Sequence, residues 1–346
     1  MRFVGFRRRP RRKGGVRPWL IWVAVLLVCV VVSSAAQGRL QGLLLPQGVV
    51  NAPGNQQITY LESDAPYSKS DVSSEEPESS AAPAEGGSAV EEILLDGGTA
   101  VGGFFVKDST DAGLDLEQEL QKDPDLSIRT DGTPMVLIYH THTTECYLPA
   151  FTGRVYETDV SRTLDETQNV VAVGEKVAEA LRARGIGVIH DKTVHDDPVY
   201  TGAYDRSWET IQKNLEQYPS IVMTIDIHRD AMIAEDGTAY KPTVEVNGRK
   251  AAQVMIITGR DPDGSYGFPD WQDNLHTALK IQEQATAKYG SLMRPLNFCD
   301  RRYNMNATHN SLLVEFGTHV NTLSEALYAG SLFGDALADV LLRYAV

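Results

Sequence analysis

The sequence predicts an α/β domain with a mostly parallel sheet and helices on both faces, preceded by one N-terminal transmembrane helix. Short apolar runs alternate with longer segments in which apolar residues recur at helical spacing. This pattern is typical of a parallel sheet covered by helices. Near the start, residues 19–36 carry no charge, as expected of a membrane span. These two observations set the fold class and the relation of the chain to a membrane.

The first 18 residues form a basic segment with eight Lys and Arg side chains and no acidic one. A helix over 19–36 rises about 1.5 Å per residue, close to what a hydrocarbon core about 30 Å thick requires. Basic flanks stay in the cytoplasm, so we expect a single-pass anchor in the cell membrane with the remaining chain on the extracytoplasmic side. The small residues Ser34, Ala35 and Ala36 leave a cleaved signal peptide as the alternative.

Residues 37–130 are expected to form an acidic, partly disordered linker and preamble. Within them, residues 62–90 are rich in Ser, Glu, Pro and Ala and hold too few apolar side chains to offset the chain entropy of folding. Residues 131–346 hold the alternating pattern and form the expected folded domain. The net charge of −14 argues against nonspecific nucleic-acid binding, because phosphate contacts need clustered Lys and Arg.

The domain begins with the continuous apolar run 135–139, which is typical of a buried strand. Residues 166–184 predict a helix, because apolar residues from Val170 to Leu181 recur at helical spacing and Gly185 follows. The remaining elements are expected as strands at 186–189, 220–225, 254–258 and 312–314, and as helices at 208–218, 275–289 and 323–344. The last helix opens with Thr322 and Glu325, a capping-box pair.

Several strand ends carry side chains suited to metal binding or acid–base chemistry, and active sites of parallel sheets lie beyond such ends. In chain order these side chains are His140, His142, Glu145, Asp226, His228 and Glu315. Neutral imidazole nitrogens and a carboxylate are the donors of a catalytic zinc site, which leaves one position for water. Another carboxylate can take the proton of that water. Because side chains alternate along a strand, His140 and His142 would point to the same side.

Other site types have no signature in the sequence. It contains no Gly-x-Gly-x-x-Gly, P-loop, Gly-x-Ser-x-Gly or His-Glu-x-x-His motif. Their absence weighs against nucleotide-binding, serine-hydrolase and zincin sites.

Three motifs resemble the signature of the stage II sporulation protein P family: VLIYHTHTTECY (136–147), DIHRD (226–230) and LLVEFGTHVNT (312–322). The order of membrane helix, acidic spacer and domain is similar as well. The resemblance implies a zinc-dependent N-acetylmuramoyl-L-alanine amidase-like catalytic domain over 131–346. It implies that the lactyl–L-alanine amide of peptidoglycan is cut during sporulation engulfment, with D,D-endopeptidase activity on cross-links in addition. It also implies a partner, a lytic transglycosylase of the stage II sporulation protein D type.

The resemblance further implies roles for single residues. The expected zinc ligands are His142, Glu166 and His228. The expected catalytic carboxylate is Glu315. The carboxylate ligand has alternatives in Asp165 and Glu145, and Glu166 equally fits a capping box with Thr163.

Two other motif residues are expected to support the reaction. The first motif lacks the Asp-Pro-Gly lead-in of the wider amidase group, so His140 remains an alternative to His142, or else supports it from behind. Arg229 is expected to bind a carboxylate of the stem peptide. The competing function is a non-catalytic, membrane-anchored scaffold that binds peptidoglycan or a partner through the same residues without stoichiometric metal.

Overall fold

The computed structural model describes residues 50–51, 57–60 and 86–346. The expected basic segment 1–18 and membrane anchor 19–36 lie outside the described residues. Within the part of the chain that is described, no helix is both long enough and apolar enough to span a bilayer.

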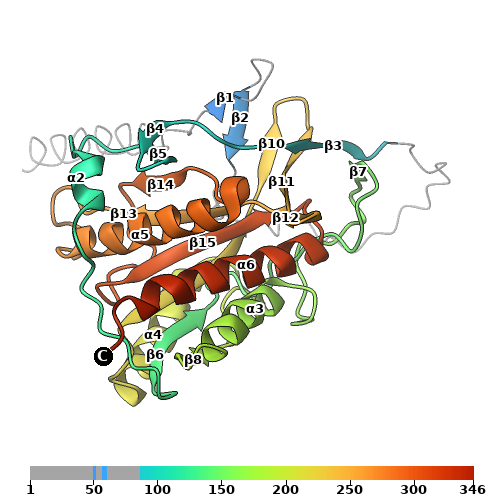
Figure 1. Cartoon of the computed structure of the whole chain (residues 1–346). Coiled ribbons are helices and arrows are strands. Elements are labelled where there is room, and N and C mark those ends of the chain that lie inside the picture. The colour runs from blue at the N-terminus through green and yellow to red at the C-terminus, as the bar shows by residue number, and fades with distance from the viewer. Residues whose placement is uncertain (1–49, 52–56, 61–85) are drawn as a thin grey trace, which may run out of the picture. The chain divides into compact units, whose positions relative to one another are not determined.

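An eight-stranded sheet forms the centre of the domain (Figure 1). Its strands, in sheet order, are β4 (Thr99–Val101), β5 (Phe104–Asp108), β14 (Leu296–Cys299), β13 (Val254–Gly259), β15 (Ser311–Thr318), β9 (Met223–Asp230), β6 (Pro134–Tyr139) and β8 (Gly187–His190). The pairings β4–β5 and β13–β15 are antiparallel, and the other five are parallel. The sheet is therefore mixed, with parallel pairings in the majority as the sequence predicts.

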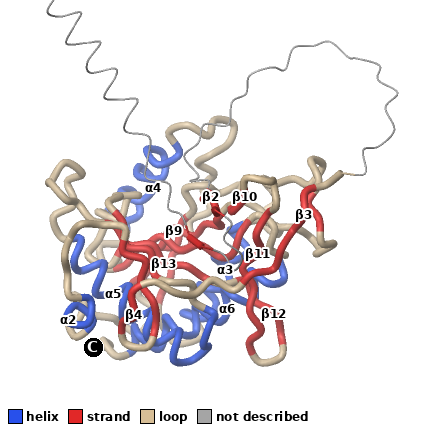
Figure 2. Tube along the Cα trace, turned by 90° about the horizontal axis from the view of Figure 1, so that it is seen from above, coloured by secondary structure: helices blue, strands red, loops and turns tan. Residues whose placement is uncertain are grey.

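Four long helices cover this sheet: α3 (Val170–Arg182), α4 (Ala203–Gln217), α5 (Trp271–Tyr289) and α6 (Leu323–Leu342). Residues of α3, α5 and α6 share the largest apolar cluster with Ile225 and Ile227 of β9. Ile211 of α4 instead clusters with Leu137 and Tyr139 of β6. Figure 2 shows α4 on the opposite side of the sheet from α3 and α6. Both faces thus carry helices, three on one face and one on the other.

Alternation along β9 and β15 separates the core from the functional groups. Ile225 and Ile227 of β9 and Val314 of β15 face the core shared with α3, α5 and α6. Neighbouring residues point to the opposite face, so His228 and Glu315 lie on the side that carries α4. These two residues are also register partners on adjacent strands. The sheet itself therefore places an imidazole beside a carboxyl group.

A second sheet is absent from the sequence prediction. Its strands are β1 (Val50–Asn51), β2 (Gln57–Tyr60), β10 (Met232–Ala234), β11 (Ala239–Val246), β3 (Ser88–Ile93) and β7 (Arg154–Val155), with β12 (Arg249–Ala252) paired to β11. Buried Lys241 of β11 donates to Glu92 of β3 and to Glu325 of α6, at 2.7 Å each. Strand β3 is therefore part of the domain, although its residues 88–90 fall in the stretch expected to be disordered and the rest falls in the expected preamble. Strands β4 and β5 and the short helix α2 (Leu116–Leu120) belong to the domain as well.

Several element boundaries differ from the predicted ones; for example, β15 extends from Ser311 to Thr318 rather than over 312–314, and α5 begins at Trp271 rather than at 275. Helix α3 begins after Asn169 rather than at 166, because the Asn169 side chain caps it by accepting from Val171 N–H at 3.0 Å. Helix α4 begins at Ala203, earlier than predicted. Strand β9 continues to Asp230, so the DIHRD motif lies within the strand rather than beyond it. The predicted capping box of Thr322 and Glu325 is present at α6.

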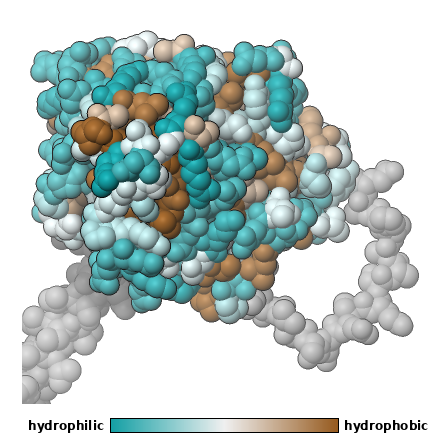
Figure 3. All heavy atoms as spheres, turned by 60° about the horizontal axis from the view of Figure 1, so that its bottom comes forward, coloured by the Kyte–Doolittle hydropathy of each residue, from teal (hydrophilic) through white to brown (hydrophobic). Residues whose placement is uncertain are grey.

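The face of the molecule seen in Figure 3 is mostly hydrophilic, with apolar side chains in smaller patches. This agrees with a chain that carries 46 acidic and 32 basic Lys and Arg side chains. The large apolar residues gather instead in the core between the sheet and the helices α3, α5 and α6.

Candidate functional site

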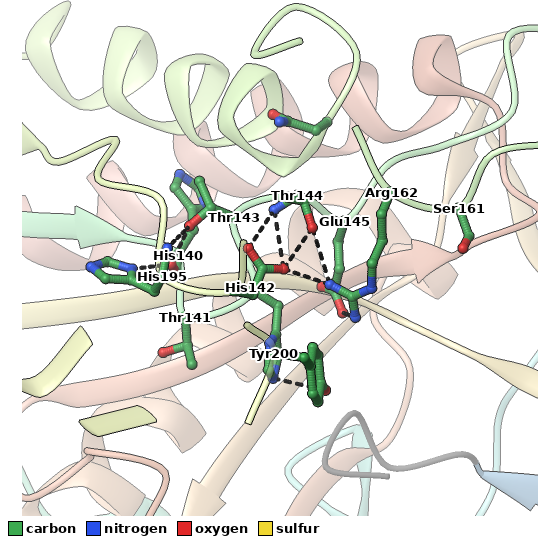
Figure 4. A network of polar contacts seen from close by, with 12 residues as sticks. His140, Thr141, His142, Thr143, Thr144, Glu145, Ser161, Arg162, His195 and Tyr200 are labelled. Atoms are coloured by element: carbon green, nitrogen blue, oxygen red, sulfur yellow. Dashed lines mark hydrogen bonds and ion pairs between the residues drawn. The ribbon is translucent and has the colours of Figure 1, made fainter. Parts of the chain in front are cut away.

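His142 lies in the turn after β6 and is buried. Its Nε2 is 3.2 Å from the Tyr200 hydroxyl, and the two rings stack with 4.6 Å between centroids (Figure 4). Its Nδ1 is buried and makes no hydrogen bond. Burial lowers the pKa of His142 to about 3, so the ring is neutral near pH 7. A proton on Nε2, donated to Tyr200, leaves the Nδ1 lone pair available.

His228 stands edge-on to His142, with 5.2 Å between ring centroids. Its Nε2 lies 2.9 Å from Asp226 Oδ1, an ion-pair contact that is not aligned as a hydrogen bond. Thr141 holds the Asp226 carboxylate through its backbone N–H and its hydroxyl, at 2.8 and 2.6 Å. Burial lowers the pKa of His228, but the carboxylates of Asp226 and Glu145 outweigh burial and raise that pKa well above its ordinary value. This position therefore favours positive charge.

Glu145 brings a carboxylate to the same buried place. Its Oε2 lies 3.6 Å from Nδ1 of His228 and accepts the Arg229 backbone N–H at 3.1 Å. Arg162 Nη2 lies 3.7 Å from Glu145 Oε1. Burial raises the pKa of Glu145, but the charges of Arg229 and His228 outweigh burial and hold it below its ordinary value. Glu145 is thus an ionised donor next to His228.

Glu315 differs from Glu145 in its surroundings. Its side chain is buried on β15 opposite His228, and its Oε2 has no hydrogen-bond partner. Burial raises the pKa of Glu315 to about 8, and the nearby Asp230 and Glu145 carboxylates act in the same direction. A carboxyl group that titrates near neutral pH and is otherwise unengaged suits general acid–base chemistry.

The imidazole nitrogens and carboxylate oxygens gathered at this site are atoms of the types that zinc binds. Within residues 86–346 and the two short stretches before them, no three His, Cys, Asp or Glu side chains are grouped to hold a metal ion as they stand. The buried Nδ1 of His142 nevertheless lacks any partner, as a metal-binding nitrogen would. The 3.6 Å between His228 Nδ1 and Glu145 Oε2 is close to the roughly 3.4 Å between two ligands of a tetrahedral zinc, given bonds of about 2.0–2.1 Å. Asp226 beside His228 matches the carboxylate that often supports a ligating histidine.

His140 lies behind this group rather than in it. Its Nδ1 is 3.0 Å from the carbonyl of Ile227, the residue before His228, and its Nε2 is 2.9 Å from Nε2 of His190. His190 in turn contacts Glu175 through Nδ1 at 2.9 Å. Burial lowers the pKa of His140 to about 3. This arrangement favours His142 as the metal ligand. His140 instead supports β9 through its contact with the Ile227 carbonyl.

Two of the carboxylates expected from the sequence are not brought to this buried group. Glu166 is about half exposed and lies 3.8 Å from Lys192. Asp165 is exposed and accepts from the backbone N–H and hydroxyl of Thr167 in a local turn. Of the three alternatives for the carboxylate ligand, only Glu145 lies beside His228.

Arg229 is also placed differently from the expectation. Its guanidinium donates to the backbone carbonyls of Cys146, Ser161 and Asp230, at 3.2, 2.8 and 3.4 Å. The residue is 7% exposed. Arg229 therefore holds the loop after Glu145 in place, and these contacts do not support the expected role in binding a substrate carboxylate.

The site is also lined by residues of the loop 191–202 and the start of α4, which the sequence motifs do not predict. Tyr200 stacks on His142, and the Tyr204 ring stands edge-on to it with 5.6 Å between centroids. Asp196 accepts from the Thr144 N–H and hydroxyl and from Arg162 Nη1, which ties the loop to the first motif. Tyrosines in a loop carry no local signal for such a role.

A family model described as Stage II sporulation protein P (SpoIIP) matches residues 54–339. The chain belongs to the stage II sporulation protein P family. All three motifs that carry the resemblance lie in the matched range, so the resemblance is confirmed. Stage II sporulation protein P of Bacillus subtilis (strain 168) is 29% identical over 231 residues, which cover 64% of this chain and 54% of that protein. The chain thus spans about half the length of this curated relative of the stage II sporulation protein P family.

Two solved structures are similar at lower identity. The N-acetylmuramoyl-L-alanine amidase AmiC2 of Nostoc punctiforme is 15% identical, with 62% of this chain and 98% of that chain covered and a TM-score of 0.34. The CwlD amidase from Clostridioides difficile, in complex with the GerS lipoprotein, is 14% identical, with 61% and 98% covered and a TM-score of 0.37. Membership of the stage II sporulation protein P family rests on the sequence match.

Proposed function

We propose that this protein is a zinc-dependent peptidoglycan hydrolase that cleaves the amide between the lactyl group of N-acetylmuramic acid and L-alanine during sporulation engulfment. One observation carries the proposal: the imidazoles of His142 and His228 and the carboxyl groups of Glu145 and Glu315 meet on one face of the sheet. Two histidines and two carboxyl groups supply both the ligands and the base that metal-assisted amide hydrolysis needs.

In this proposal His142, His228 and Glu145 hold the zinc ion. His142 offers its unpartnered Nδ1, and His228 and Glu145 offer the Nδ1 and Oε2 atoms that face each other. Bound zinc supplies Lewis acidity, which polarises the amide carbonyl and makes a water molecule more acidic. Asp226 orients His228 from its far side, and Tyr200 orients His142.

Glu315 moves the proton. Its free Oε2 would take a proton as the water oxygen bonds to the lactyl carbonyl carbon. The same carboxyl group would then return this proton to the L-alanine nitrogen as the carbon–nitrogen bond breaks. The first products are a lactyl carboxylic acid on the glycan and a peptide with a free L-alanine amine. The acid then passes its proton to the amine, which gives a carboxylate and an ammonium group, so atoms and charge balance.

Further expectations from the sequence belong to the same proposal. They are D,D-endopeptidase cleavage of peptide cross-links, cooperation with a stage II sporulation protein D-type lytic transglycosylase, and anchoring in the cell membrane through 19–36 with the domain on the extracytoplasmic side. Membership of the stage II sporulation protein P family and the apolar run near the N-terminus support them.

The test uses the full chain in detergent with isolated peptidoglycan sacculi, with added zinc or with a chelator, and analyses the products by mass spectrometry. Chelator-sensitive release of peptides with a free L-alanine amine is the expected result. Uncrosslinked stems that stay on glycan indicate endopeptidase action. Intact sacculi together with a chain that binds no zinc would overturn the proposal and favour the scaffold. Intact sacculi with bound zinc would be followed by addition of the transglycosylase.

A further inference from the structure

An open pocket of about 430 Å³ is lined in part by Tyr204, whose ring stands edge-on to that of His142. Its lining includes Tyr204, Tyr266, Arg301, Arg302, Tyr303 and Asn304. Tyr204 connects the two places, because its ring stands 5.6 Å from that of His142 and 5.5 Å from that of Tyr303, between centroids. A molecule bound in this pocket would therefore reach the proposed catalytic group across a single tyrosine ring.

The loop after β14 that forms one wall is held in an unusual conformation. Tyr303 and Asn304 have φ angles of +42° and +57°, a left-handed region that residues other than glycine rarely adopt. The Asn304 side chain fixes this turn by donating to the Tyr204 carbonyl at 2.8 Å and to Ser207 Oγ at 3.1 Å. Backbone strain of this kind gathers at binding and catalytic sites, where the surrounding contacts maintain it.

The pocket is cationic in an otherwise acidic chain. Arg301 and Arg302 line it, and none of its lining residues is acidic. Arg302 Nη1 donates to the Tyr266 carbonyl at 3.1 Å, which anchors its guanidinium at the wall. The neighbouring Asp300 lies outside the lining, with its carboxylate 3.7 Å from Arg260. Asp300 also interacts electrostatically with Arg301, whose Nη1 donates to the Asp300 carbonyl at 3.0 Å. Arginine guanidinium groups favour planar anions, above all carboxylates and phosphates.

We propose that this pocket binds the peptide side of the substrate through a carboxylate held by Arg301 and Arg302, with the tyrosine rings packed along the peptide. This inference rests on the proposed function and names the part of the substrate that the pocket takes. The lactyl carboxyl group of the glycan is consumed in the amide, so the acetylated amino sugars are neutral there. The carboxylates of such a substrate lie on its peptide, and an arginine pocket therefore selects the peptide over the glycan.

L-alanine has no free carboxylate within the peptide, so an acidic second residue offers the nearest one. An extended peptide advances about 3.3–3.6 Å per residue, so the carboxylate of an acidic second residue lies roughly 7 Å from the scissile amide. In the structure one tyrosine ring, that of Tyr204, separates His142 from this pocket. We therefore assign the pocket to the carboxylate of the second peptide residue.

Two probes that differ in one group test this inference: N-acetylmuramoyl-L-alanyl-D-glutamate, and the same compound with the α-carboxylate of the second residue replaced by a carboxamide. Binding is measured calorimetrically to the zinc-loaded full chain carrying Glu315→Gln, to exclude turnover. Arg301→Gln and Arg302→Gln are then added, singly and together. Arg249→Gln, an exposed charge whose guanidinium stacks on Tyr328 instead, is the matched control for net charge.

We expect the acid to bind about tenfold more tightly than the carboxamide, and the double arginine variant to lose this preference. The carboxamide affinity should change less than twofold, and Arg249→Gln should change neither. Three results would overturn the proposed subsite: equal affinity of both probes for the Glu315→Gln chain, no binding of either probe at 10 mM, or an equal loss of the preference for the acid with Arg249→Gln. Cleavage of sacculi by the chain with Glu315 intact is assayed separately. Cleavage without a preference for the acid probe would refute only the subsite. A preference for the acid probe without cleavage would refute only the proposed function.

Discussion

Glu145 Oε2 and His228 Nδ1 lie 3.6 Å apart, and each side chain is only 1% exposed. The His228 ring also faces Asp226, so the imidazole stands between two carboxylates. Two buried carboxylates without a cation would repel each other, and a cation at His228 offsets that cost. This relationship makes Glu145, rather than Glu166, the carboxylate that we expect to bind zinc.

Glu145→Gln and Glu166→Gln form a matched pair that tests this choice. Both changes remove one charge with little change in shape. We expect Glu145→Gln to weaken zinc affinity by at least about 100-fold, since even residues that only support a ligand contribute 10–100-fold. Glu166→Gln should retain zinc, because Glu166 is half exposed and contacts Lys192. Metal content after dialysis against a weak chelator measures both, and loss of zinc from Glu166→Gln alone would reverse the assignment.

Glu315→Gln should separate metal binding from turnover. The amide keeps the volume of the side chain but cannot take a proton, and general base catalysis contributes about 10²–10⁴-fold to rates. We expect zinc content to stay unchanged and the rate of L-alanine amine release from sacculi to fall by that factor. Glu245→Gln, an exposed position on β11, is the control and should keep the full rate. Undiminished release by Glu315→Gln would exclude Glu315 from the mechanism.

Part of this site can be predicted from local sequence, because an apolar run followed by a polar motif identifies each strand and its functional residues without knowledge of the rest of the fold. The continuous apolar runs of β6 and β15 mark buried strands whose motifs contain His142 and Glu315. His228 lies in the motif that ends β9, the strand predicted from residue 220. The choice of the zinc-binding carboxylate among the three candidates cannot be made from local sequence. Asp165 and Glu166 precede the capped start of α3, and only the path of the chain decides that they stay at the surface while Glu145 is buried.

The strands of the second sheet are not predicted by local periodicity, because they are formed by pairing between segments far apart in the sequence. Strand β11 pairs with β3 in parallel over a large sequence separation, and neither strand has a continuous apolar run. Tyr200 likewise meets His142 only because the loop 191–202 folds over the first motif. Such contacts depend on loop closure and tertiary packing rather than on the residues next to them in sequence.

Asp335 should contribute to acid sensitivity of the fold. It accepts from Arg184 Nη2 at 3.1 Å, from the Tyr289 hydroxyl and from Lys288, and so joins α6 to α5 and to the end of α3. Burial raises the pKa of Asp335, but the hydrogen bonds of Lys288 and Tyr289 outweigh burial and lower it to about 2. Because the folded pKa lies below the ordinary value of 3.8, this stabilisation is full above about pH 4 and is lost as the pH falls through about 2.

Asp335→Asn tests that dependence through urea unfolding at pH 7, 4 and 2.5. The side chain is a third exposed, so solvent screening limits the expected loss of unfolding free energy at pH 7 to about 1 kcal/mol. The difference from the wild type should shrink between pH 4 and pH 2.5. Asp205→Asn, at an exposed position near the start of α4, serves as control. A difference that stays constant down to pH 2.5 would assign the effect of Asp335 to shape rather than to charge.

Gly174 of α3 leaves the space in which His140 and His190 meet. A Cβ atom added there would lie 2.8 Å from His140 Cε1 and 2.8 Å from His190 Nε2, closer than real Cβ contacts. Glycine within a helix ordinarily costs about 0.5–1 kcal/mol relative to alanine, so Gly174→Ala would stabilise an open position. Here we expect overpacking, which costs about 1–3 kcal/mol of unfolding free energy, to outweigh that gain and to push His140 away from the Ile227 carbonyl.

The expected result for Gly174→Ala is a Tm several degrees lower, at about 2–4 °C per kcal/mol for a domain of this size, together with slower cleavage of sacculi. Slower cleavage follows because His140 supports β9 directly before His228. Gly86→Ala is the control, since a Cβ there meets nothing within 4 Å. A higher Tm for Gly174→Ala would mean that the two imidazoles separate without cost, and that His140 does not need His190 to hold β9 in place.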